Sequence, residues 1–278
     1  MTKRFGIVCI LLASVACLSA CADKKKDAPA LPAEKIYNNA MDDMDKKDYE
    51  KAVESFEQLD REYPYSPWAT KSQIMAAYGY YKKQKYDDAL LALDHFIKLH
   101  PGNEDTPYAY YLTALCYYER IADVRRDQEM TDKAKKALKE VVARFPDTEY
   151  GRDAQLKLDL VEDHLAGKEI EIGRYYLKKG NILAAINRYK RVIENYDTTS
   201  HTAEALYRLT EAYLALGVYN EAQKYAAVLG HNYPASKWYK NSYRLLNNNA
   251  LPTVAEKEYD EKNTSIVNKT LETIGIKK

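Results

Sequence analysis

The strongest constraint on the fold is a spacing that recurs along the chain. In three segments an alanine follows a tyrosine by three residues, and a proline follows that alanine by twelve. The sets are Tyr49/Ala52/Pro64, Tyr86/Ala89/Pro101 and Tyr219/Ala222/Pro234. Each set lies in a stretch of helical periodicity, and the proline predicts where the helix ends. A fixed internal spacing of this kind is typical of stacked repeats.

Another helical stretch precedes each of these segments and carries a small residue twelve positions before the alanine. The three small residues are Ala40, Ala77 and Thr210. A short side chain at such a point lets two helices cross closely. The pattern resembles the tetratricopeptide repeat, a pair of antiparallel helices of about 34 residues. We therefore predict an all-α fold, a right-handed helical solenoid of about five such helix pairs.

Two further repeats are less regular. One has Gly173, Ala185 and Tyr189 at the expected offsets, with Asp197 where the proline would stand. The other has its small residues twenty positions apart, which predicts an insertion of about eight residues around "RIADVRRDQEM". The five repeats are predicted at 33–66, 70–103, 107–148, 166–199 and 203–236. Apolar residues at helical spacing predict one long helix between the third and the fourth: Leu156, Leu160, Leu165, Ile170 and Ile172.

The first twenty residues have the parts of a secretory signal. Lys3 and Arg4 precede an apolar stretch over residues 5–18, which is too short and too interrupted to predict a membrane span. Ser19 and Ala20 then lead into Cys21 and a polar segment. This resembles the bacterial lipoprotein box, which implies a covalent lipid on Cys21. We expect no other cofactor. An aspartate directly after that cysteine commonly retains such proteins at the inner membrane, so Ala22 favours the periplasmic face of the outer membrane.

These patterns divide the chain into five parts. We expect a removed signal peptide at 1–20, a lipidated flexible tether at 21–32, and repeats one to three at 33–148. The long linking helix and repeats four and five are expected at 149–246, followed by a weakly ordered tail at 247–278.

Composition and motifs exclude several classes of function. Loss of Lys3 and Arg4 with the leader changes the formal net charge from +1 to −1, so no basic excess remains for nucleic acid. Cys116 is predicted to be a small buried apolar residue. No G-x-S-x-G, P-loop, H-E-x-x-H or paired C-x-x-C motif is present, and the histidines do not fall at metal-ligand spacing. We therefore predict neither catalytic nor metal-binding residues.

A peptide-binding surface is the remaining prediction. The chain has 26 tyrosines but only 4 phenylalanines, and amphipathic rings suit partly wet surfaces. In the tetratricopeptide arrangement the first helix of each repeat lines the concave face. The tyrosines expected there are Tyr37, Tyr78, Tyr81, Tyr111 and Tyr118, and the later repeats would contribute Ile170, Arg174, Leu177, Tyr207, Glu211 and Leu214. Such a groove suits an extended or helical peptide. Packing between repeats is the alternative for about half of these rings.

The lipoprotein box, the short tether and five repeats with a long helix after the third together resemble the BamD family of outer-membrane β-barrel assembly lipoproteins. The resemblance implies a non-enzymatic periplasmic subunit of the machine that folds and inserts β-barrel proteins. It implies that the first repeats bind C-terminal segments of unfolded barrel proteins, and that the last repeats bind the barrel-bearing central subunit. Arg188 and Arg191 in the fourth repeat are candidates for the second contact. Other assembly lipoproteins are further candidate partners.

Two alternatives stay open at the level of sequence. One is another repeat-bearing lipoprotein adaptor, such as one that coordinates envelope constriction with wall synthesis. The other is a wall-degrading enzyme in which two of the many carboxylates cleave glycosidic bonds. Co-purification of a barrel-bearing subunit would support the β-barrel assembly function over the adaptor, and an assay on isolated peptidoglycan tests the enzyme.

Overall fold

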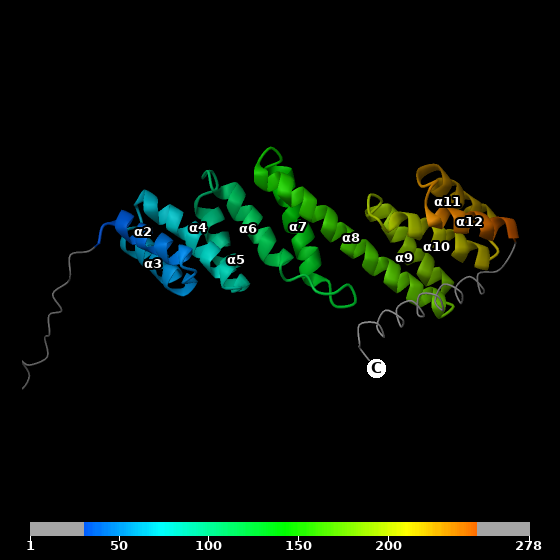
Figure 1. Cartoon of the computed structure of the whole chain (residues 1–278), viewed down its shortest axis with the longest axis horizontal. Helices are drawn as coiled ribbons and strands as arrows, with labels where there is room; N and C mark the ends of the chain where they lie inside the picture. Colours follow the sequence, from blue (N-terminus) through cyan, green and yellow to red (C-terminus); the bar gives the residue numbers. More distant parts are fainter. Residues whose placement is uncertain (1–30, 249–278) are drawn as a thin grey trace, which may run out of the picture. The chain divides into compact units, whose positions relative to one another are not determined.

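The computed structural model describes residues 31–248, and every regular element among them is an α-helix (Figure 1). The helices are α2 (Ala33–Asp45), α3 (Tyr49–Glu62), α4 (Pro67–Lys82), α5 (Tyr86–Leu99), α6 (Thr106–Tyr118), α7 (Glu129–Arg144), α8 (Glu149–Lys178), α9 (Ile182–Asn195), α10 (Thr202–Ala215), α11 (Tyr219–Asn232) and α12 (Lys237–Asn248). Cys21, the predicted leader and the tail from residue 249 onward lie outside the described residues. Within residues 31–248 no helix has the length and apolar character needed to cross a bilayer.

The chain falls into two compact units, and the boundary after Ala76 lies inside α4. In the first unit α2 packs against α3. In the second unit each helix from α5 to α11 packs on the next in chain order, and α12 covers α10 and α11 (Figure 1). The all-α class and the sequential pairing of helices are confirmed.

The predicted long helix is α8 (Glu149–Lys178), and its two halves belong to different cores. In the first half Leu158 and Val161 pack with Leu138 of α7. In the second half Ile170 packs with residues of α9 and α10, including Tyr189 and Leu209. One unbroken helix therefore joins the third helix pair to the fourth.

The second helix of each pair ends two residues before the proline position of its repeat. Four of these helices precede Pro64, Pro101, Pro146 and Pro234, and α9 ends in the same way two residues before Asp197. Proline is therefore not required for the stop. After α9 the hydroxyls of Thr199 and Thr202 donate to the carbonyl of Tyr196 at 2.7 and 3.1 Å, which satisfies a backbone acceptor at the helix end.

The predicted insertion is the loop of residues 119–128 between α6 and α7. Its conformation is held from within. The side-chain amide of Gln128 donates to the carbonyls of Asp123, Val124 and Arg126 at 3.2, 3.4 and 3.0 Å. One side chain thus provides hydrogen bonds to three backbone carbonyls of a loop that lacks the regular backbone hydrogen bonding of a helix or a sheet.

Cys116 matches its prediction as a small residue of the core. Its side chain is fully buried in α6, and it is the free cysteine among the residues that the structure describes. Burial raises the pKa of its thiol to about 12. The thiol is therefore protonated and unreactive at neutral pH.

The small residues of the repeat spacing are packing requirements. The alanines and the threonine at these positions are fully buried: Ala40, Ala52, Ala77, Ala89, Ala114, Ala134, Ala185, Thr210 and Ala222. Gly173 takes the same role in α8. A Cβ added there would overlap the ring of Tyr189, which is itself fully buried between α8 and α10. The ring of one helix occupies the space that the glycine of the other leaves open.

We predict that Gly173→Ala destabilises the protein. In an ordinary helix interior this change stabilises by about 1 kcal/mol. Here the added methyl meets the Tyr189 ring, so we expect a net loss of about 1 to 3 kcal/mol, measured as the free energy of unfolding in urea. Gly102→Ala is the control, because its methyl meets nothing within 4 Å. An increase in stability with Gly173→Ala would contradict the close crossing.

Candidate functional site

Tyr37 is the predicted inward tyrosine of the first unit. Its ring centroid lies 5.6 Å from that of Phe56 and 4.9 Å from that of Trp68. The side chain is half-buried against the core cluster of that unit, which includes Leu59. Much of this ring therefore serves packing between α2, α3 and the start of α4.

Tyr78 and Tyr81 lie one turn apart on the part of α4 that belongs to the second unit. Their rings stack with centroids 6.3 Å apart, and Tyr81 also contacts Tyr86 at 5.9 Å. The Tyr81 hydroxyl donates to Glu119 at 3.3 Å. Burial, and then the Glu119 charge, raise the pKa of Tyr81, so it stays a neutral donor. Both rings are half-buried, which leaves part of each in solvent.

Tyr111 and Tyr118 on α6 meet the first half of α8. The Tyr111 hydroxyl donates to Asp153, and its ring lies 5.5 Å from the ring of Tyr150. The ammonium of Lys157 lies 5.8 Å from the centroid of the Tyr118 ring and donates to Asp153 at 2.8 Å. Two tyrosines of α6 thus flank one ion pair of α8.

The protonation states at this contact are well defined. Hydrogen bonds from Lys157 and then from Tyr111 lower the pKa of Asp153, so its carboxylate is ionised at neutral pH. Burial, and then the bond to Asp153, raise the pKa of Tyr111. At neutral pH the contact therefore presents a protonated Tyr111 and an ionised Asp153.

We call Tyr78, Tyr81, Tyr111 and Tyr118 the tyrosine surface. The sequence reasoning missed two rings beside it. Tyr108 and Tyr150 stand 5.4 Å apart, and burial raises the pKa of Tyr108. Tyr150 was overlooked because it lies in the first half of the long helix, to which no repeat had been assigned.

A spacing in the sequence could have shown that the first half of α8 also carries inward positions. Eight residues after each proline position stands a small, fully buried residue of the following helix, as with Ser72, Ala109 and Ala154. The inward positions lie two, six and nine residues after this small residue. Counting from Ser72 gives Tyr78 at the offset of six, and counting from Ala109 gives Tyr111 at the offset of two. In α8 the same count gives Leu156 and Leu160. They are 65% and 61% exposed, although their spacing had been used only to predict a helix.

A shallow pocket of about 500 Å³ opens at the turn between α4 and α5. It is lined by Gln84, Lys85, Tyr86, Asp87, Asp88 and Arg120. Arg120 donates to Asp87 at 2.7 Å, so two of its charges already satisfy each other.

Arg188 and Arg191 meet the same carboxylate of their own chain. Arg188 Nη1 lies 3.2 Å from Glu169 of α8, and Arg191 Nη1 lies 3.5 Å from it. Arg188 is half-buried and Arg191 is exposed. The structure brings the predicted basic pair together on α9, and Glu169 offsets part of its charge.

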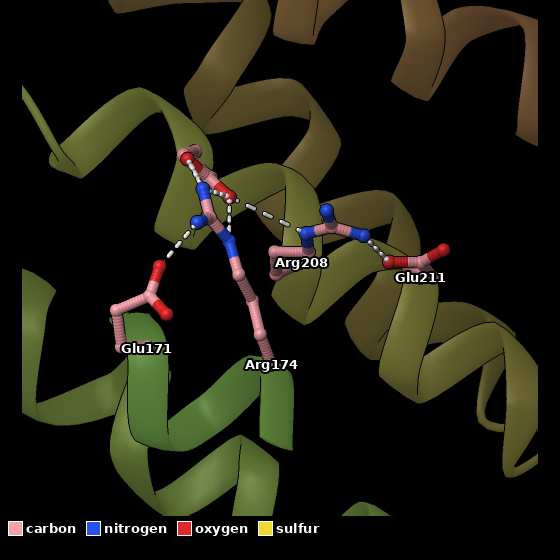
Figure 2. Close-up of polar contacts among 5 residues, drawn as sticks. Glu171, Arg174, Arg208 and Glu211 are labelled. Atoms are coloured by element: carbon pink, nitrogen blue, oxygen red, sulfur yellow. Dashed lines mark hydrogen bonds and ion pairs between the residues drawn. The ribbon is translucent and has the colours of Figure 1, made fainter. Parts of the chain in front are cut away.

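The last helix pairs carry a buried charge network (Figure 2). Arg174 of α8 donates to both oxygens of Glu204 of α10 at 2.5 to 2.8 Å and to Glu171 at 2.6 Å. Arg208 donates to Glu211 at 2.8 Å and lies 3.5 Å from Glu204. The side chains of Glu204 and Glu211 are only 7% and 2% exposed. These bonds join α8 to α10 and compensate charges that would be costly to bury alone.

This burial corrects the expectation of an open groove in the later repeats. Ile170, Tyr207 and Glu211 were predicted to line it, and all three are buried. Ile170 belongs to the core, and Tyr207 packs on Trp238 of α12 at 5.3 Å. For Tyr207 the sequence reasoning failed because α12 was not counted as a packing partner. Arg174, Leu177 and Leu214 are half-buried, as are the tyrosines of the earlier helices. Among the inward positions of the described residues, Leu156 and Leu160 of α8 are exposed.

We predict that Arg174→Ala destabilises the second unit by about 2 kcal/mol, because among residues 31–248 Glu204 would then have only the more distant Arg208 as a cation. The loss is below that of a fully buried pair because Arg174 is partly exposed. Urea unfolding would measure it. Lys98→Ala, which breaks the exposed pair with Asp94, is the control and should change stability by less than about 0.5 kcal/mol. Equal effects of both variants would contradict a structural role for the network.

Comparison with known proteins identifies similar chains. The family model described as YfiO, outer membrane lipoprotein, matches residues 29–229. The outer membrane protein assembly factor BamD of Caulobacter vibrioides is 47% identical over 254 residues, which cover 90% of this chain and 83% of the relative. The BamD of Rickettsia prowazekii is 48% identical over 232 residues, covering 83% and 92%. The TPR2AB-domain:pHSP90 complex of yeast Sti1 is a solved structure whose matching chain is 14% identical, with 82% of this chain and 86% of that chain covered and a TM-score of 0.42.

Proposed function

The chain belongs to the BamD family of outer-membrane protein assembly factors, and from that premise we propose which of its surfaces bind which partners. It is a non-catalytic outer-membrane lipoprotein and a component of the β-barrel assembly machine. Family membership replaces the two alternatives, the wall-coordinating adaptor and the wall-degrading enzyme. We assign the lipid anchor to Cys21. We further propose that the early helix pairs bind unfolded barrel proteins and that the last pairs bind the barrel-bearing central subunit, with other assembly lipoproteins as further candidates.

The tyrosine surface is the observation that carries client binding. Its rings are half-buried, and two of the hydroxyls are oriented by carboxylates, Tyr81 by Glu119 and Tyr111 by Asp153. Side chains fixed in this way lose little conformational entropy on binding. An unfolded barrel strand offers apolar side chains and unpaired backbone groups. Tyrosine can contact the first through its ring and the second through its hydroxyl.

We predict that Tyr78→Ala combined with Tyr81→Ala lowers the affinity for a client C-terminal peptide about tenfold or more. Truncation of a binding hot spot typically costs about 2 kcal/mol, and each 1.4 kcal/mol is a factor of ten. Fluorescence anisotropy with a labelled peptide would measure the affinity.

The matching Tyr→Phe pair should lose less, because it keeps the stacked rings and removes only the hydroxyls. Circular dichroism would establish that both double variants are folded. A folded double-alanine variant that binds as tightly as the parent would place the client site elsewhere.

For the central subunit we propose the basic pair on α9. Glu169 holds both guanidinium groups at one place, and each keeps further donors for a carboxylate of the partner. Because Glu169 already offsets part of their charge, Arg188 and Arg191 contribute to partner binding more through the fixed placement of their N–H donors than through net positive charge.

We predict that Arg188→Met combined with Arg191→Met reduces co-purification of the central subunit from solubilised membranes. Glu169→Gln is the matched control: it removes the same two ion pairs but leaves both cations in place. It should therefore retain the partner. If both variants lose the partner equally, the arginines act through the fold of the chain, and if neither does, the interface lies elsewhere.

A further inference from the structure

One face of α8 continues the tyrosine surface. Asp153, Leu156, Lys157 and Leu160 are spaced at i, i+3, i+4 and i+7, so they lie on a single side of the helix. The core face of the same segment is a different one, formed by Ala154, Leu158 and Val161. The two leucines are thus exposed beside residues that contact Tyr111 and Tyr118.

Lys157 is held in place with donors to spare. Its ammonium group has three N–H donors, and within residues 31–248 it makes one hydrogen bond, to Asp153. The Tyr118 ring lies on another side of it. Asp153 in turn is fixed by Tyr111. The lysine is therefore positioned on the same face as the exposed leucines and can still bind an anionic group.

We propose that this face of α8 reads the end of the client chain. Lys157 binds the free α-carboxylate, and Leu156 and Leu160 contact apolar side chains that precede it. The proposal rests on the client-binding function above and deepens it, since it names the chemical group at the client's C-terminus that is recognised and the residues that recognise it.

The spacing of the leucines suits an extended chain. Alternate side chains on one side of a strand are about 6.6 Å apart. Residues four apart in a helix are separated by about 6 Å along its axis. A strand that lies along α8 can therefore place successive same-side residues over Leu160 and Leu156.

The charges suit a single carboxylate. Asp153 offsets Lys157, so the pair does not form a positive patch that would attract polyanions in general. A lone carboxylate can nevertheless form charge-assisted hydrogen bonds to the remaining ammonium donors. A client that ends in an apolar strand supplies that group and the apolar side chains together.

The test compares two labelled peptides of one alternating apolar sequence with a terminal phenylalanine, one a free acid and the other a C-terminal amide. We expect the parent to bind the acid about tenfold more tightly, the range of a hydrogen bond to a charged group. The Lys157→Met variant should lose this preference, because its affinity for the acid peptide falls while its affinity for the amide peptide stays the same. The Lys157→Arg variant should keep the preference. Unchanged amide binding also establishes that the variant is folded.

The leucines are tested in the same assay. Leu156→Ser with Leu160→Ser should weaken both peptides by a similar factor of about ten or more, because apolar contact does not depend on the end group. Two controls should change nothing. Lys98→Met breaks another i,i+4 Asp–Lys pair, with 2.7 Å between its charged atoms, and Leu183→Ser changes a leucine that is 68% exposed on α9.

Several outcomes would overturn the inference. Equal affinity of the parent for acid and amide, or a preserved preference in Lys157→Met, removes Lys157 from the subsite. Unchanged binding by the double serine variant removes the leucines. If Tyr78→Ala with Tyr81→Ala still loses affinity in those cases, the proposed function stands without the subsite. A parent that binds neither peptide overturns both.

Discussion

Two helices cross closely only where one of them presents almost no side chain, and this condition shapes the whole chain. Ala89, Ala185 and Ala222 are fully buried at such crossings, and at Gly173 even a methyl group is excluded by the Tyr189 ring. A close crossing fixes the rotation of each helix about its axis as well as its distance from the neighbour. Residues at a set offset from the small residue must then face the same side. The tyrosine surface is a consequence of packing in this sense, since the crossings decide which positions face inward.

The inward positions are used differently along the second unit. In α4 and α6 they are half-buried tyrosines, and in the first half of α8 they are exposed leucines. In α10 Tyr207 and Glu211 are covered, because Glu211 is bonded to Arg208 and Tyr207 lies against Trp238. A buried carboxylate needs complete compensation, which ties its side chain to one conformation and removes it from binding. The early part of the unit therefore keeps the surface that we assign to the client, whereas in the late part Tyr207 and Glu211 take part in holding α8, α10 and α12 together.

Much of this fold could be predicted from the sequence, because the repeat spacing is local and recurs. The ends of α3, α5 and α11 follow from it, and apolar residues at helical spacing predict the long helix α8. The failures concern contacts between residues distant in the sequence. Nothing near Arg188 indicates that Glu169, nineteen residues earlier, is its partner, since that pairing depends on how α8 and α9 pack. The role of Leu156 was missed for a different reason: the count of inward positions was applied to complete repeats only, and the first half of α8 lacks a second helix of its own.

The continuity of α8 has a consequence for how the two proposed binding regions are related. Lys157 and Leu160 lie in its first half, while Glu169 and Arg174 lie in its second, and the helix runs through its 30 residues without a break. A helix of that length spans about 45 Å and resists bending unless a proline or a bulge interrupts it. The side chains that we assign to the client end and the carboxylate that holds the basic pair of α9 are thus carried on one rigid element. Their separation along the axis is set by residue count: twelve residues from Lys157 to Glu169, or about 18 Å. Recognition of a client end and contact with the central subunit are in this arrangement fixed in register by a single helix, so neither site can shift along that axis without the other.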